Sequence, residues 1–283
     1  MKREKPALVV CVSDLHAGST LGLCHADGAD LDDGGKYLPS VYQRWLWARW
    51  LEFVDEAAGR AVGRRVYVAL NGDLVDGQVK ESQQVVTASP GVQQEMALAA
   101  LAPIMELADR LFVVRGTEAH TGKSAVGEEM IARALGAERG ADVRWSTDEA
   151  ATWWTLRAEW GGVLWDFAHH TSASRLAWTS GNAASRLAAE AIVDAADRHE
   201  PVPRMVVRSH VHRSQDSYEN YEACRAIIMP AWQLRTAYGH RIAARLADIG
   251  GLIAGCHRGE LEDVRVRKYR VQKARVWHED EAA

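Results

Sequence analysis

Histidine and acidic side chains recur along this chain at the ends of short apolar runs. Two motifs alternate, Asp14-Leu15-His16 and His210-Val211-His212, so both polar side chains of each motif can project to one side of the backbone. Carboxylate and imidazole groups are ligands that divalent transition metals accept. Four further side chains of these types follow apolar runs, namely Asp73, Glu118, His120 and His169. Together with the two motifs they are too many ligands for one tetrahedral ion, and they suit two metal ions that share a bridging ligand.

The elements that must position these side chains alternate along the chain. Buried strands are predicted where apolar runs stop at turn signals, at 8–12, 66–70, 111–114, 163–168 and 205–207. Amphipathic helices are predicted over 41–58, 92–109, 124–136 and 183–198. This alternation indicates an α/β layered fold, in which the carboxyl ends of neighbouring strands converge on one crevice. Ligands that are distant in sequence can meet there.

The chain shows no internal repeat and no clear linker. We therefore expect a single domain over 1–283, with the chemical motifs inside 8–213. Segment 152–168, with a Gly161-Gly162 turn, and segment 262–271 are predicted as paired strands. Residues 214–283 would complete the fold with C-terminal strands and a helix.

Composition limits the function classes. The 283 residues carry 34 basic and 38 acidic side chains, a net charge of −4. That balance disfavours sequence-blind clamping of duplex DNA, although it leaves a local basic groove open. No apolar run approaches the roughly 20 residues that span a bilayer, so no membrane partner is expected. The four cysteines form no C-x-x-C pair, which favours reduced thiols in a cytoplasmic protein.

Five segments follow one another in a fixed order: Asp14-Leu15-His16, Gly72-Asp73, Gly116-Thr117-Glu118-Ala119-His120, His169-His170 and Ser209-His210-Val211-His212. Together they resemble the five motifs of the calcineurin-like metallophosphoesterases, and the third resembles that of phage and prophage members. The resemblance implies a four-layer α/β/β/α sandwich with two mixed sheets. It also implies two divalent metal ions at the strand ends, for which manganese, iron, zinc and nickel all suit this ligand mixture.

The resemblance assigns a role to each motif residue. Asp73 would bridge both metals, and His120 would be catalytic, as the group that protonates the leaving oxygen or steadies the phosphoryl charge. The remaining ligands fall into two sets, with Asp14, His16 and His212 on the first metal and Glu118, His169 and His210 on the second.

The implied reaction is hydrolysis of a phosphodiester or phosphomonoester by a hydroxide held between the two metals. Nucleotides and nucleic acids are among the substrates that the family accepts, so a nuclease activity stays open. His170, Arg115 and Arg213 flank the motifs and are predicted substrate contacts, the arginines because guanidinium groups grip phosphate.

The third motif departs from the family pattern, which reads Gly-Asn-His followed by an acid. Here Glu118 is taken to replace the asparagine ligand, with one extra residue before His120. A carboxylate in place of an amide should strengthen metal binding and slightly weaken Lewis acidity.

Two alternatives belong to other function classes. Segment 116–124 approaches a phosphate-binding P-loop, but five residues separate its glycines, where the motif has four, so a nucleoside-triphosphatase is the first alternative. The second is a non-catalytic scaffold with the same fold and a degenerate metal site, against which stands the number of strong ligands.

Overall fold

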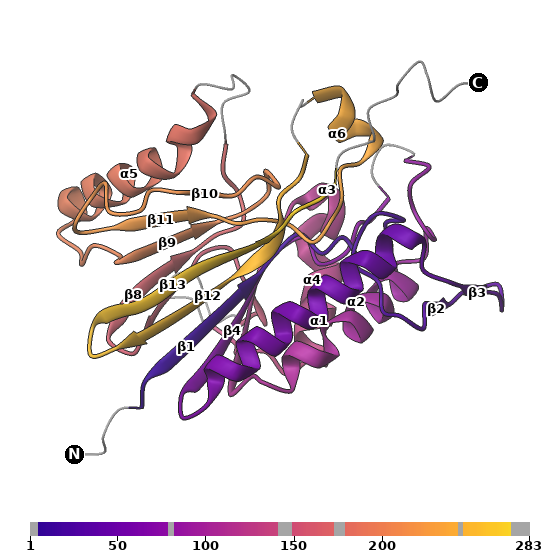
Figure 1. The fold of residues 1–283 in the computed structure, drawn as a ribbon, viewed down its shortest axis with the longest axis horizontal. Helices are drawn as coiled ribbons and strands as arrows, with labels where there is room; N and C mark the ends of the chain where they lie inside the picture. Colours follow the sequence, from indigo (N-terminus) through magenta and orange to yellow (C-terminus); the bar gives the residue numbers. More distant parts are fainter. Residues whose placement is uncertain (1–4, 79–81, 141–148, 173–178, 243–245, 273–283) are drawn as a thin grey trace, which may run out of the picture.

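The computed structural model describes residues 5–78, 82–140, 149–172, 179–242 and 246–272 (Figure 1). Its first sheet contains the strands β1 (Ala7–Val12), β4 (Arg65–Asn71), β5 (Arg110–Val114), β6 (Thr152–Trp153), β12 (Ile249–His257) and β13 (Glu260–Tyr269). They lie in the order β13-β12-β1-β4-β5-β6. β1 pairs in parallel with β4 and antiparallel with β12, so the sheet is mixed.

The second sheet contains β7 (Leu156–Trp160), β8 (Val163–Phe167), β9 (Met205–Arg208), β10 (Gln215–Asp216) and β11 (Arg225–Ile228). Their order is β10-β11-β9-β8-β7, with parallel pairing in the centre and an antiparallel strand at each edge. The predicted Gly161-Gly162 turn joins β7 to β8. This sheet is therefore mixed as well.

The helices are α1 (Val41–Ala61), α2 (Pro90–Met105), α3 (Glu118–Thr121), α4 (Val126–Ala134), α5 (Ala183–Arg198) and α6 (Ala237–Ile242). Two 3-10 turns, η1 (Lys123–Ala125) and η2 (Ser180–Asn182), and a small hairpin of β2 (Ala29–Asp30) and β3 (Lys36–Tyr37) complete the set. Ser40 caps α1 in a capping box with Gln43. None of the described helices is long and apolar enough to cross a membrane.

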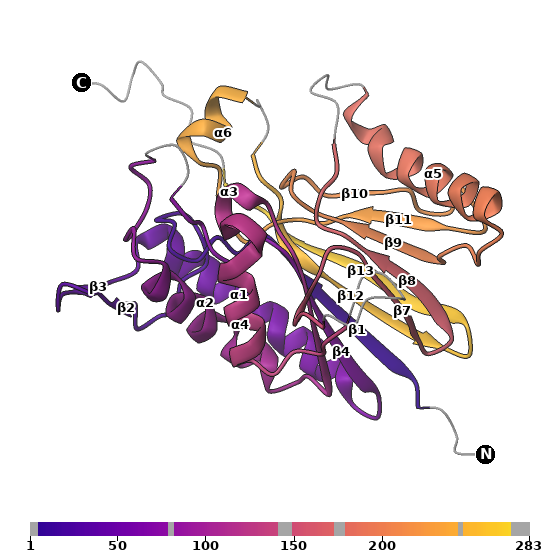
Figure 2. The ribbon, with the colours of Figure 1, turned by 180° about the vertical axis from the view of Figure 1, so that it is seen from behind.

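The elements stack in four layers. Even-numbered residues of β1, such as Leu8 and Val10, pack under α1 and α2, whereas Val9 and Cys11 face the second sheet. On the far side of the second sheet, Ala188 of α5 packs on β9 and β11. Figures 1 and 2 show α1, α2 and α4 on one outer face and α5 on the other. The predicted α/β/β/α sandwich with two mixed sheets is confirmed.

Candidate metal centre

The strands that were expected to carry ligands end at one edge of the sandwich. β1, β4 and β5 are neighbours in the first sheet, and β8 and β9 are neighbours in the second. Asn71, at the end of β4, donates from Nδ2 to Ala168 O just beyond β8, at 3.1 Å, so the two sheets meet here. Within the described part of the chain, three groups hold ligand atoms within 4.8 Å of one another: Asp14, His16 and His212; His16, Asp73 and His120; Asp73, His169 and His210.

The first group has the geometry of ligands that share an ion. His212 Nε2 lies 3.1 Å from Asp14 Oδ1 and 3.1 Å from His16 Nε2. Ligand atoms at such separations can surround one ion at metal–ligand distances of about 2.0–2.2 Å. His16 Nδ1 lies 3.1 Å from Asp76 Oδ1, which accepts a hydrogen bond from it. The lone pair of the neutral ring then lies on Nε2.

The third group, which contains Asp73, His169 and His210, centres on His169. This histidine is fully buried. Its Nδ1 donates to Asn71 O at 2.7 Å, so the lone pair of the neutral ring lies on Nε2. Nε2 lies 3.0 Å from Asp73 Oδ2 and 4.0 Å from Asp14 Oδ1. Yet His169 Nε2 and Asp14 Oδ1 are both buried without an aligned hydrogen bond. Buried polar atoms rarely stay unsatisfied, and this carboxylate and imidazole set fits divalent transition metals.

The charges of the cluster stabilise one another strongly. Burial alone would raise the pKa of Asp14, but the charges of His212 and His169 outweigh it and lower that pKa to about 2. Burial is likewise outweighed at Asp73, where His169 lowers the carboxyl pKa. The pKa of His169 rises to about 10, because Asp73 and Asp14 overcome the desolvation of the ring. The two carboxylates therefore favour a positive charge at the position of His169.

The backbone that presents these ligands is strained. Non-glycine residues rarely adopt positive φ, and aspartate and histidine do so more readily than most. Such strain concentrates at functional sites. Five residues of the cluster have φ between 47° and 76°, namely Asp14, His16, Asp73, His210 and His212.

Two glycines let the motif loops touch. A Cβ on Gly72, whose φ is +88°, would collide with His169 Nδ1 and lie 2.8 Å from Gly116 Cα. A Cβ on Gly116 would collide with Asp73 N. The close approach of the loops that carry Asp73 and Thr117 thus depends on glycine at both positions.

Asp76 and Gln233 belong to the site although the sequence analysis did not single them out. Asp76 Oδ1 accepts from Gln233 Nε2 at 3.1 Å, in addition to its contact with His16. The backbone oxygen of Asp76 accepts from His120 Nδ1 at 2.7 Å. Asp76 thereby orients a predicted ligand, His16, and the predicted catalytic histidine, His120. In the sequence, the one indication of this role is that Asp76 lies only three residues after Asp73.

The third motif differs from the prediction. Glu118 is exposed and belongs to none of the ligand groups found among the described residues. Thr117 lies at the cluster instead: its N–H donates to Asp73 Oδ1 at 2.6 Å, and its Oγ1 lies 3.0 Å from His210 Nδ1. Glu118 is the first residue of α3, in the turn that follows Thr117, so its role as a ligand stays a prediction.

That helical turn also accommodates the extra residues of the motif. The amides of His120 and Thr121 donate to Thr117 O at 2.9 and 3.0 Å, so one turn of α3 brings His120 back beside His16, with ring centroids 4.5 Å apart. Gly122 N likewise donates to Glu118 O. These amides are therefore committed to the turn and cannot ring a phosphate, so the P-loop alternative does not fit.

The predicted substrate contacts lie in different settings. His170 is exposed, and its ring centroid lies 5.2 Å from that of His169 and 5.5 Å from that of His210, at the open side of the cluster. Arg213 follows His212 and is partly exposed. Arg115 has other partners, since its Nε donates to Thr152 Oγ1 at 2.9 Å and its guanidinium lies 5.1 Å from the ring centroid of Trp154.

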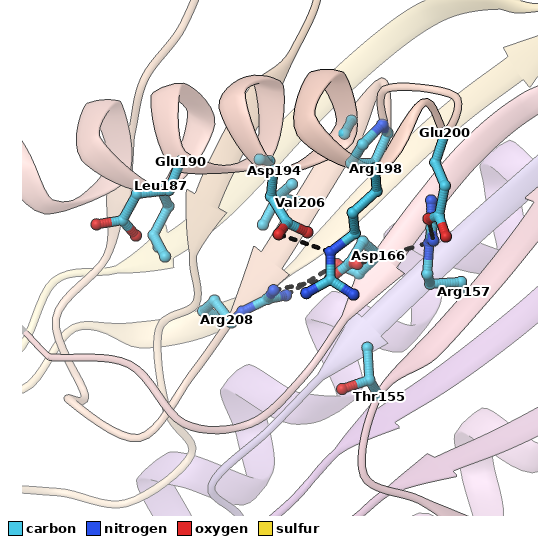
Figure 3. A pocket seen from close by; sticks show the side chains of 13 residues that line it. Thr155, Arg157, Asp166, Leu187, Glu190, Asp194, Arg198, Glu200, Val206 and Arg208 are labelled. Atoms are coloured by element: carbon cyan, nitrogen blue, oxygen red, sulfur yellow. Dashed lines mark hydrogen bonds and ion pairs between the residues drawn. The ribbon is translucent and has the colours of Figure 1, made fainter. Parts of the chain in front are cut away.

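A pocket of about 560 Å³ lies elsewhere, between α5 and the second sheet (Figure 3). Its charged side chains, apart from Glu190, pair with one another, as Arg208 does with Asp166 at 2.7 Å and Arg198 with Asp194 at 2.8 Å. None of the residues that line it belongs to the metal cluster. The pocket and the metal cluster are therefore separate features of the fold.

No protein-family profile and no curated protein matches this chain. Similar solved structures include a zinc-complexed Vps29 from Entamoeba histolytica, with a TM-score of 0.42, 11% identity and coverage of 93% of this chain and 98% of that one. A predicted phosphoesterase from Streptococcus pneumoniae has a TM-score of 0.33, 10% identity and coverage of 93% and 98%. The sulfate thiohydrolase SoxB from Thermus thermophilus has a TM-score of 0.40, 10% identity and coverage of 95% and 57%. These likenesses are distant.

Proposed function

We propose that this chain is a calcineurin-like metallophosphoesterase, which hydrolyses phosphoesters with two divalent metal ions. The observation that carries the proposal is the convergence of five strand ends from two sheets on linked ligand groups. Asp14, His16 and His212 would hold one ion, and His169 and His210 the other. Asp73 lies within reach of both sides and would bridge them.

The chemistry divides between ions and side chains. When bound, two divalent cations neutralise the charge of the phosphate and make a coordinated water acidic enough to attack near neutral pH. His120 donates from Nδ1 to the backbone oxygen of Asp76, which leaves Nε2 free to carry the second proton of an imidazolium. In that protonated form, Nε2 would give its proton to the leaving oxygen and the ring would return to neutral. His170, which is exposed, would contact the phosphoester at the open side of the cluster.

The sharpest test measures metal content and hydrolysis together. Protein loaded with Mn²⁺ or Zn²⁺ is assayed on a chromogenic phosphodiester, a chromogenic phosphomonoester, plasmid DNA and oligonucleotides. Asp73→Asn and His212→Ala should each lose metal and most activity. If both variants keep the wild-type metal content, the assignment of the site is wrong.

The same experiment separates catalysis from a scaffold role. Two bound metals without turnover of any of these substrates would favour the non-catalytic alternative.

All four cysteines are buried with free thiols, which supports our proposal that the protein works in the reducing cytoplasm.

A further inference from the structure

The carboxylate of Glu128 is buried beside the metal cluster. The side chain, which belongs to α4, is 0% exposed, and no lysine or arginine of the described chain forms an ion pair with it. Burial and the nearby charge of Asp73 raise the pKa of Glu128 to about 7. Burying an uncompensated carboxylate is costly, so the contacts that retain it are informative.

Each oxygen of this carboxylate accepts a backbone hydrogen bond from a different motif loop. Gly116 N donates to Oε2 at 2.6 Å, and Leu74 N donates to Oε1 at 3.2 Å. Leu74 follows Asp73 directly, and Gly116 directly precedes Thr117. One side chain, from an element outside the five motifs, therefore joins the loop after β4 to the loop after β5.

The two joined loops meet at the bridging carboxylate. Thr117 N donates to Asp73 Oδ1 at 2.6 Å, and a Cβ on Gly116 would lie 3.0 Å from Asp73 Cα. If the loops moved apart, Asp73 would lose Thr117, and His210 would lose the hydroxyl that lies beside its ring. We propose that Glu128 is a positioning residue, which clamps these two loops at the separation that the metal cluster requires.

The clamp needs both oxygens of a carboxylate. A glutamine of the same shape has one oxygen and one amide group, so either Gly116 N or Leu74 N would face another donor. Glu128→Gln should therefore break one of the two bonds without leaving a cavity. Glu129→Gln is the matched control, because Glu129 lies on the same helix but accepts from Ala151 N at 3.1 Å and Thr152 Oγ1 at 2.8 Å.

The first readout is amide hydrogen exchange by NMR in metal-free protein at about pH 8, where the Glu128 carboxyl is mostly ionised. Glu128→Gln should accelerate exchange at Gly116 or Leu74 by about tenfold, the loss of one hydrogen bond to a charged group. Glu129→Gln should leave exchange at Gly116 and Leu74 unchanged. Unchanged exchange at both of these amides in Glu128→Gln would overturn the clamp.

The second readout is Mn²⁺ affinity by calorimetry. Loss of a group that orients metal ligands typically weakens binding by about 10- to 100-fold, which we expect for Glu128→Gln but not for Glu129→Gln. Equal weakening in both variants would show that Glu128 acts only through general stability, and the proposal would fall.

The effect of Glu128 on metal binding rests on the proposed function. The experiments can nevertheless refute the loop-joining role of Glu128 and the proposed function separately. If wild-type protein binds no Mn²⁺, the proposed function is wrong, while exchange at Gly116 and Leu74 still decides whether Glu128 joins the loops.

Discussion

At the scale of single residues, His120 lies where it could either bind an ion or transfer a proton. Its ring belongs to a ligand group with His16 and Asp73, yet its Nδ1 is held by a backbone oxygen. We predict that His120→Asn keeps both metals and lowers kcat by about 10²- to 10⁴-fold, the usual size of a lost proton-transfer group.

Metal analysis and steady-state kinetics of the same preparation check this prediction. His199→Asn, at an exposed histidine beyond α5, is the control and should change neither quantity. Loss of one metal from His120→Asn would instead make His120 a ligand.

Thr117 and Glu118 give a second test at this scale. Because the Thr117 hydroxyl lies between Asp73 and His210, we expect Thr117→Ala to weaken metal binding about tenfold. Glu118→Ala should leave affinity unchanged, since its side chain is exposed. Calorimetry with Zn²⁺ on both variants measures the difference, and the reverse order would restore Glu118 as the ligand.

The residues that sequence could identify are those that share a short segment. Asp14 and His16 form a recognisable pair because residues two positions apart in an extended segment project to the same side of the chain. Gln233 has no such neighbour: it reaches Asp76 across 157 positions, and only the folded chain brings them together. Thr117 was not predicted, because the carboxylate of the neighbouring Glu118 is by type the stronger metal ligand. In the structure it is Thr117, directly after Gly116, that lies beside Asp73 and His210.

At the scale of elements, glycine controls how closely the strand-end loops approach. Gly72→Ala adds a methyl group against His169 and Gly116 at a φ of +88°. We expect it to cost about 2–5 kcal/mol, from overpacking of 1–3 and left-handed strain of 1–2 kcal/mol. Urea unfolding measures this loss in the free energy of unfolding.

Gly63→Ala is the control for backbone strain alone. Its φ is +75°, and nothing lies within 4 Å of the added Cβ, so only about 1–2 kcal/mol should be lost. Equal losses in the two variants would contradict a close contact at Gly72.

One of the strands that the sequence did not predict, β12, is obscured by its glycines. Residues 249–257 contain three glycines, which weaken a strand pattern. The structure explains them by neighbours that are remote in sequence: a Cβ on Gly251 would meet Phe53 of α1, and one on Gly250 would meet the backbone oxygen of Arg267. By contrast, β1, β4 and β5 were predictable because continuous apolar runs are typical of strands covered on both faces.

At the scale of the whole molecule, protons and metals compete for one cluster. The raised pKa of His169 stabilises the metal-free fold below pH 6.5, and this contribution is lost as pH rises toward about 10. The raised pKa of Glu128 acts in the same direction, with stability lost between pH 4.5 and about 7. The lowered pKa values of His16, His170 and His210 act in the opposite direction, but only below pH 6.5. We therefore predict that the Tm of chelator-treated protein falls from about pH 7 to about pH 9.

Metal loading should reverse that trend. Ions need a deprotonated imidazole and ionised carboxylates, so affinity rises with pH, and with it the gain in Tm. Thermal scans at both pH values, with and without Mn²⁺, measure the effect. A gain in Tm that is the same at pH 7 and pH 9 would show that His169 does not bind the ion.

The left-handed backbone at Asp14, His16, Asp73, His210 and His212 bears on attempts to redesign the centre. Replacement by asparagine or glycine suits that conformation, whereas valine, isoleucine or threonine would distort it before any ligand preference could be expressed. A library aimed at a different ion should therefore randomise positions with ordinary φ first. Thr117, whose φ is −74°, is such a position.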